Sequence, residues 1–113
     1  MPISGSDTII RDFFLGFVRI HVLHHAAEEP VYGLALIEEL GRHGYNLSPG
    51  TLYPLLRRLE AAGYLRSERR NDEGRIRKYY TATPVGRRVL KKARVRIREL
   101  VEEVVSGPEQ PDP

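Results

Sequence analysis

The sequence predicts a mainly α fold of the α+β class, with four helices and one β-hairpin in a single small domain. Three observations support this prediction. Apolar residues recur with a helical period over most of the 113 residues. The period changes to alternation only between residues 64 and 82. Proline steps and single glycines separate the periodic segments, and a chain of this length accommodates one hydrophobic core.

The first helix is expected over residues 8–27, and it is apolar around most of its circumference. Its apolar side chains are Ile9, Ile10, Phe13, Phe14, Phe17, Val18, Ile20, Leu23 and Ala27. We expect such a helix to be covered on two sides, by its own core and by a partner subunit. Pro30 ends it, and a second helix is expected over residues 32–43, followed by Gly44 as its cap.

A third helix is expected over residues 49–62. Ser48 offers a side-chain oxygen to the free N–H groups, and Pro49 suits the first helical position. The buried face consists of leucines at positions 52, 55, 56 and 59. Pro54 lies inside this helix, where a proline ordinarily removes a hydrogen bond and bends the axis.

Alternating residues from 64 to 82 predict a β-hairpin whose turn is Asn71-Asp72-Glu73-Gly74. Its edges and tip carry the basic side chains Arg66, Arg69, Arg70, Arg75, Arg77 and Lys78. Thr83-Pro84 then begins a last helix, expected over residues 84–106. The proline-rich, acidic segment 107–113 is expected to be a disordered tail.

The charge is concentrated in the middle of the chain. The formal net charge is only +3, but residues 51–98 contain fifteen basic and four acidic side chains. Such a block favours a polyanionic partner, because lysine and arginine that contact phosphate release condensed counterions. The alternative is a highly charged helix surface that faces water.

The order helix, helix, turn, helix and basic hairpin is that of a winged helix-turn-helix. In such proteins the second helix of the motif enters the major groove of DNA. Here that helix is 49–62, and its polar face offers Thr51, Arg57 and Arg58. The sequence therefore predicts a protein that binds double-stranded DNA.

Two strings carry a resemblance to a known family. GTLYPLLRRLE begins at Gly50 and GRIRKYY begins at Gly74, with Tyr32-Gly33 upstream of both. Over roughly residues 9–105 the chain resembles the PadR family of bacterial transcriptional regulators, and its single helix after the wing resembles the short subfamily. The resemblance implies a homodimeric winged-helix repressor that tolerates Pro54. It implies a DNA-binding domain over 8–83 and a C-terminal dimerisation helix over 84–106.

The resemblance also assigns DNA-binding residues by position. They are Ser48, Gly50, Thr51, Tyr53, Pro54, Arg57 and Arg58 in the recognition segment, and Arg75, Arg77, Lys78 and Tyr79 in the wing. We expect Thr51 and Arg58 to contact bases or set the register. The cations of the wing are expected to hold phosphates.

The first and last helices are expected to form the dimer interface. The expected interface residues are Ile10, Phe14, Phe17, Leu90, Ala93, Ile97, Leu100 and Val104. The last five repeat at alternating spacings of three and four, which is the coiled-coil pattern. The alternative is a stripe that packs only within its own chain.

Three histidines, His21, His24 and His25, lie at positions i, i+3 and i+4 of the first helix. This spacing allows two imidazoles to share a metal ion. The alternative, which we favour, is that they are partly buried interface or surface residues.

Several classes of function are excluded by what the sequence lacks. The absence of cysteine excludes a disulfide framework, a thiolate metal site and a cysteine nucleophile. Without paired acids or a phosphate-binding glycine loop, we expect neither an enzyme nor a resident cofactor. No apolar run of membrane length and no leader pattern is present, so we expect a cytoplasmic protein.

The sequence thus predicts a sequence-specific regulator, specifically a repressor, which binds an inverted-repeat operator as a homodimer. A small-molecule or metal effector is expected to release it. Two alternatives stay open: a metal-responsive regulator built on the histidine cluster, and a winged-helix module that binds protein or RNA.

Overall fold

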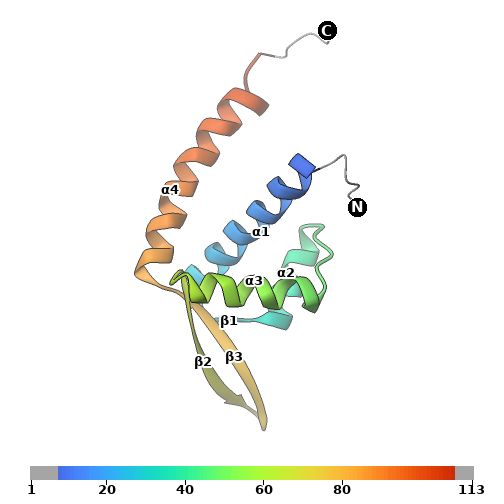
Figure 1. Ribbon diagram of the computed structural model, residues 1–113, viewed down its shortest axis with the longest axis vertical. Helices are drawn as coiled ribbons and strands as arrows, with labels where there is room; N and C mark the ends of the chain where they lie inside the picture. The colour runs from blue at the N-terminus through green and yellow to red at the C-terminus, as the bar shows by residue number, and fades with distance from the viewer. Residues whose placement is uncertain (1–7, 109–113) are drawn as a thin grey trace.

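The computed structural model describes residues 8–108 (Figure 1). The elements in chain order are α1 (Thr8–Glu28), β1 (Val31–Tyr32), α2 (Gly33–Arg42), α3 (Pro49–Ala61), β2 (Leu65–Asp72), β3 (Arg75–Ala82), α4 (Pro84–Leu100) and the π-helical turn η2 (Val101–Val105). The four helices and the hairpin are those that the sequence predicts. Of the expected tail 107–113, residues 109–113 lie outside the described residues.

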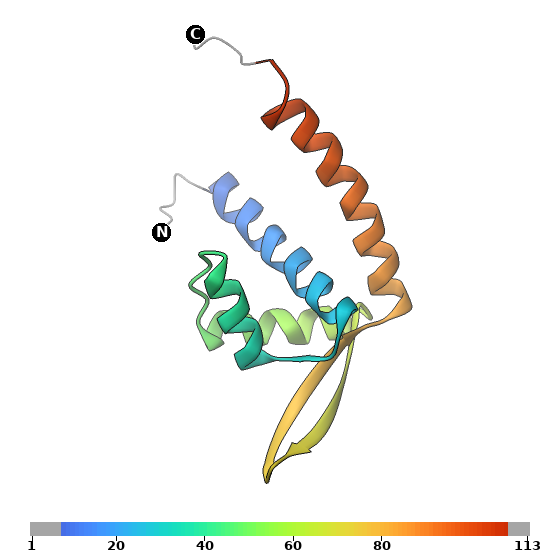
Figure 2. The same cartoon turned by 180° about the vertical axis from the view of Figure 1, so that it is seen from behind.

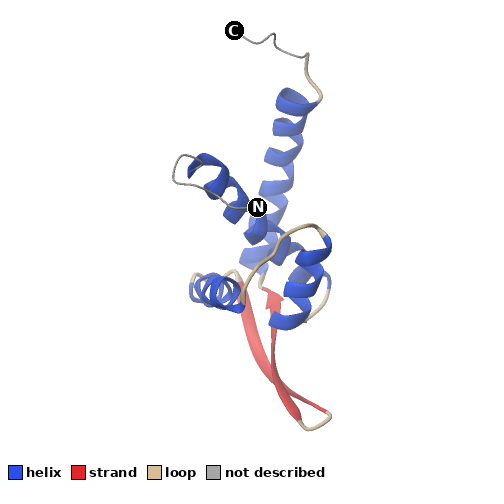
Figure 3. Cartoon of the chain, turned by 90° about the vertical axis from the view of Figure 1, so that its right-hand side faces the viewer, coloured by secondary structure: helices blue, strands red, loops and turns tan. Residues whose placement is uncertain are grey.

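The three strands form one antiparallel sheet in the order β1-β3-β2. The hairpin is paired from Leu65 with Ala82 to Asp72 with Arg75, so its turn has two residues and not the expected four. Glu73 and Gly74 both have positive φ, 52° and 85°, as a tight hairpin turn of this kind requires. The hairpin extends away from the helices as a wing (Figure 3).

Strand β1 was not expected, because residue 32 was predicted to begin the second helix. Val31 instead pairs with Tyr80 and Tyr32 with Tyr79. Tyr32 is therefore extended, with φ of −115° and ψ of 160°, and the helix begins one residue later. This short strand attaches the segment before α2 to the base of the wing.

The hydrophobic core lies where α1, α2 and α3 meet the base of the hairpin (Figure 2). The four leucines predicted for the buried face of α3 are all buried. The other buried apolar residues are Val18, Val22, Leu23, Ala26, Leu36, Leu40, Leu47, Leu65, Tyr80, Ala82 and Leu90.

Helix α3 is continuous through Pro54. Pro54 has no N–H to donate to the carbonyl of Gly50, and Gly50 lies in the exposed first turn of the helix. The side-chain cap expected from Ser48 is absent. The Ser48 hydroxyl lies 3.2 Å from the Thr51 hydroxyl, and the Ser48 carbonyl accepts the N–H of Leu52.

Helix α4 is fixed where it begins, at the turn that links α3 to β2. The Thr83 hydroxyl accepts the N–H of Gly86 at 3.0 Å and donates to the carbonyl of Gly63 at 2.5 Å. Gly86 is buried, and a Cβ built on it would lie 2.2 Å from the Tyr64 carbonyl oxygen. Only glycine therefore allows α4 to approach the chain this closely.

Beyond Leu90 the helix leaves the core, and α4 and α1 diverge (Figures 1 and 2). In η2 the N–H of Ser106 donates to the carbonyl of Val101, five residues back. A π-helical turn has more residues per turn than an α-helix. Val104 is therefore rotated about the helix axis relative to the position that the α-helical spacing of the stripe predicts. None of the described helices is long and apolar enough to cross a membrane.

We predict that Gly86→Ala lowers the free energy of unfolding by about 1–3 kcal/mol, because the new methyl group overlaps backbone and not a movable side chain. Chemical denaturation monitored by circular dichroism measures this. The matched control is Gly41→Ala in α2, which is exposed with open space around it. Alanine there should raise the stability by roughly 0.5–1 kcal/mol. Equal midpoints for Gly86→Ala and the unmodified protein would contradict the prediction.

Candidate nucleic-acid interface

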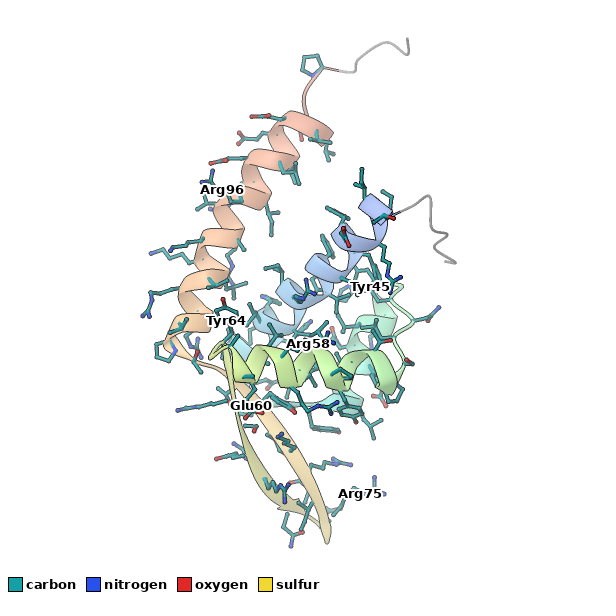
Figure 4. The ribbon with its side chains drawn as sticks, in the orientation of Figure 1. Tyr45, Arg58, Glu60, Tyr64, Arg75 and Arg96 are labelled. Carbon is teal, nitrogen blue, oxygen red and sulfur yellow. The ribbon has the colours of Figure 1, made fainter. Side chains whose placement is uncertain are left out.

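The burial of four leucines determines which face of α3 reaches solvent. Thr51, Arg57 and Arg58 are exposed, as the sequence predicts for a recognition helix. Ser48 and Gly50 are also exposed, at the N-terminal end of the same helix. Figure 4 shows Arg58 on α3 and Arg75 close to the tip of the wing.

A groove of about 340 Å³ lies between α3 and the wing. Its lining contains four cationic side chains from the two elements, Arg57, Arg75, Arg77 and Lys78. Tyr53 and the exposed Ile76 also line it, whereas Arg58 does not. The structure therefore brings Arg57 together with the three predicted cations of the wing, whereas Tyr79 and Arg58 lie outside the lining.

Tyr32 orients a cation of the wing, a role that sequence reasoning did not assign to it. The guanidinium carbon of Arg77 lies 4.3 Å from the centre of the Tyr32 ring. The Tyr32 ring in turn packs edge-on against Tyr79, with the ring centres 5.4 Å apart. This contact depends on β1, which was too short to be recognised in the sequence.

Tyr53 is half-buried because its ring packs against the N-terminus of α2. A Cβ built on Gly33 would lie 2.4 Å from the Tyr53 ring, so glycine makes room for the aromatic side chain. Pro54 is half-buried too. The Tyr32-Gly33 pair thus supports both parts of the interface, with Tyr32 under the wing and Gly33 under α3.

Glu60 joins the end of α3 to the wing. The Ser67 hydroxyl donates to its carboxylate at 2.5 Å, and the Lys78 ammonium lies 3.4 Å from its other oxygen. The hydrogen bond from Ser67, together with the charge of Lys78, lowers the pKa of Glu60. A carboxylate that stays ionised in this way holds Lys78 against the helix and limits movement of the wing.

The tip of the wing is organised around Asp72. The half-buried Tyr79 donates its hydroxyl to this carboxylate, and that hydrogen bond raises the pKa of Tyr79. Arg77 lies 3.9 Å from the same carboxylate. Arg75, at the first position of β3, is exposed and forms no ion pair within the described residues. Of the wing cations expected to meet phosphate, Arg75 therefore carries the least compensated charge.

The three histidines of α1 do not form one ligand set. His24 pairs with Glu28 at 2.6 Å. His21 packs between Phe17, His43 and Tyr45, with ring centres 4.9–5.5 Å away. Burial, together with the neighbouring His43 and His25, lowers the pKa of His21. Two groups of three metal-capable side chains occur among the described residues, and His21 belongs to neither.

Comparison with known proteins agrees with this geometry. A sequence profile described as the transcriptional regulator PadR-like family matches residues 22–92, which span α2, α3 and the wing. The chain is also 53% identical over 98 residues to the transcriptional regulator Rv3488 of Mycobacterium tuberculosis. That alignment covers 87% of this chain and 92% of the relative.

Solved structures show the same fold. A PadR-like transcription factor from Bacteroides fragilis superposes with a TM-score of 0.75 at 30% identity, over 87% of this chain and 96% of that one. A PadR family transcriptional regulator from Eggerthella lenta gives 0.70 at 38% identity, over 88% and 91%. The matched profile covers α3 and the wing, which are the two elements that form the cationic groove. The chain therefore belongs to the PadR-like family of transcriptional regulators, which bind DNA and are not enzymes.

Proposed function

We propose that the protein is a transcriptional repressor that binds an inverted-repeat operator as a homodimer and is released by an effector. The observation that carries the proposal is the cationic groove between α3 and the wing. Helix α3 is the second helix of the helix-turn-helix motif, which in such proteins enters the major groove. The cations of the adjacent wing can then contact the phosphate backbone of the same duplex. A bacterial repressor binds the chromosome, so we place the protein in the cytoplasm.

Within this surface we assign base or register contacts to Thr51 and Arg58 and phosphate contacts to Arg75, Arg77 and Lys78. Arginine can donate two hydrogen bonds to guanine, and a lysine or arginine of the wing provides charge without sequence information. Arg57, on the groove side of α3, adds to the phosphate-binding charge. Residues 8–83 would thus bind DNA, and residues 84–106 would join two subunits.

The proposed dimer interface is the apolar surface that α1 and α4 leave uncovered. The large apolar side chains exposed on α1, α4 and η2 are Ile9, Ile10, Phe13, Phe17, Val95, Ile97, Leu100, Val101, Val104 and Val105. Exposed apolar surface of this extent is typical of an interface. A second copy of the chain supplies the same two helices and can cover it.

Two of the expected interface residues contribute differently. Leu90 is 3% exposed and belongs to the core of its own subunit, so the stripe available to a partner begins at the half-buried Ala93. Phe14 is half-buried against Tyr45, with ring centres 5.1 Å apart. The exposed apolar side chains of α1 are therefore Ile10 and Phe17 of the expected set, together with Ile9 and Phe13.

An apolar groove of about 660 Å³ between α1 and α4 supports the effector part of the proposal. Phe13, Phe17 and Ile20 form its α1 side, and Val89 and Ile97 form its α4 side. Its volume suits a small molecule. Because the groove lies inside the proposed interface, a bound effector would change how the two subunits fit together.

A winged-helix module that binds protein or RNA is the competing function. Binding to duplex DNA by lysine and arginine weakens steeply as salt rises. A repressor also prefers one duplex over competitor DNA, which a protein-binding module does not. Selection of duplexes from a random pool by the purified protein distinguishes the two functions and supplies the operator.

We predict that the protein sediments at about twice its chain mass of 12.9 kDa at micromolar concentration. Leu100→Glu, which places a charge in the apolar stripe, should shift the equilibrium toward monomer. Lys91→Glu is the control, because it places the same carboxylate side chain on α4 outside the stripe, with a net charge change that is larger by one. A monomer of the unmodified protein under these conditions would refute the proposed interface.

We predict different losses of DNA affinity for two arginine substitutions. Arg77→Ala should weaken binding to all sequences alike and lower the slope of log affinity against log salt by about one. Arg58→Ala should cost roughly 1–3 kcal/mol and relax the preference at one base pair. Fluorescence anisotropy at several salt concentrations measures both. Arg96→Ala on α4 is the control, since it lies far from the wing (Figure 4). Wild-type affinity in both test variants would mean that the DNA surface is elsewhere.

We predict that binding depends on the spacing of the two half-sites. A two-fold dimer presents two copies of α3, and half-sites about 10 bp apart lie on one face of the duplex. Insertion of about 5 bp rotates one half-site to the far side and should abolish tight binding. Substitutions within a half-site should cost roughly 1–3 kcal/mol each. If the insertion leaves the affinity unchanged, the subunits bind independently.

A further inference from the structure

A cluster of metal-capable side chains lies where α1 meets the end of α2. It consists of His25 on α1, Glu39 on α2 and His43, the residue that follows α2. One ligand atom from each lies within 4.8 Å of the others, and the imidazole of His43 is 3.6 Å from Glu39 Oε1. None of the three lines the α3–wing groove, so the proposed DNA contact does not account for the cluster.

The donor set is chemically suited to a borderline divalent cation. Two imidazole nitrogens and one carboxylate oxygen match the three protein ligands of open zinc sites, where the fourth position is left to water. Zinc ligands lie about 2.0–2.2 Å from the metal, so neighbouring ligand atoms are about 3.3 Å apart. The observed separations, 3.6 Å between His43 and Glu39 and up to 4.8 Å across the cluster, are somewhat wider than this value.

The surroundings of the cluster orient its members. Arg42 pairs with Oε2 of Glu39, which leaves Oε1 directed toward His43. The ring of His21 packs edge-on against that of His43, with the ring centres 5.2 Å apart, and covers one side of the cluster. Glu39 is 32% exposed and His43 48%, so an ion can enter from solvent.

A second group, His24, His25 and Glu28, shares His25 and lies entirely on α1. Here His24 and His25 are adjacent in sequence, so they point about 100° apart around the helix and converge poorly on one ion. Glu28 is 62% exposed and already pairs with His24 at 2.6 Å. The cluster that spans two helices is the better site, because its ligands approach from different directions.

We propose that His25, Glu39 and His43 form a binding site for a zinc-class divalent cation that links α1 to α2. The site differs from the His21, His24 and His25 set that the sequence suggests, since only His25 belongs to both. A bound ion would join the helix of the proposed dimer interface to the first helix of the DNA-binding motif. It would therefore stabilise the arrangement of the two.

The test uses the untagged full-length chain, freed of metal by a chelator and then titrated with zinc chloride in a calorimeter. We expect one zinc ion per chain and a rise in the thermal unfolding midpoint with added zinc, because the ion binds the folded state. Cobalt(II) in place of zinc should give visible absorption bands of a low-symmetry, four-coordinate site.

Single variants distinguish the two groups of ligands. Glu39→Gln and His43→Ala should each lower zinc affinity at least about tenfold, since each removes a ligand, whereas His24→Ala should leave it unchanged. Circular dichroism without metal verifies that each variant is folded. A loss in His24→Ala with none in Glu39→Gln would assign the ion to the group on α1 and overturn the proposal. Absence of zinc binding by the unmodified chain would also overturn it.

Discussion

The arrangement of the proposed DNA-binding face depends on the burial of one side of α3. Leu52 and Leu56 are fully buried, and Leu55 and Leu59 nearly so, which fixes the rotation of the helix about its axis. This rotation directs the side chains of Thr51, Arg57 and Arg58 toward solvent. At about 25 cal/mol per Å² of apolar surface, a rotation that exposed these leucines would cost several kcal/mol. The hydrophobic core thus sets the direction of the proposed recognition residues, although they are not part of it.

The wing adds charge, but its cations are not equivalent. Arg77 stacks on Tyr32, Arg70 on Tyr79, and Lys78 is held by Glu60. These contacts restrain long side chains that otherwise lose conformational entropy when they meet phosphate. Arg57, Arg58 and Arg75 have no such restraint within the described part of the chain. We infer that the restrained cations set the distance to the DNA backbone, while the unrestrained ones adapt to it.

The helices and the hairpin could be predicted from the sequence because their signals are local. Leucine spacing, the Thr83-Pro84 step and strand alternation each require only neighbouring residues. Strand β1 could not be predicted, because two residues carry no period and its partner, β3, lies almost fifty positions away. The role of Tyr32 beneath Arg77 was missed for the same reason. Ser48 had the right residue type for a cap, but the Thr51 hydroxyl competes for its side chain.

Helix α1 connects the two proposals. Val18 and Val22 anchor it in the core, Phe13 and Phe17 line the groove beside α4, and His25 approaches the end of α2. A helix is stiff along its length, so a displacement at Phe17 is transmitted to His25, about 12 Å further along the axis. Residues 43–48, which begin with His43, connect the end of α2 to α3. A ligand between α1 and α4 and an ion between α1 and α2 would therefore both act on the contact between α1 and the end of α2. If the displacement alters the spacing of His25 and His43, each ligand would change the affinity of the protein for the other.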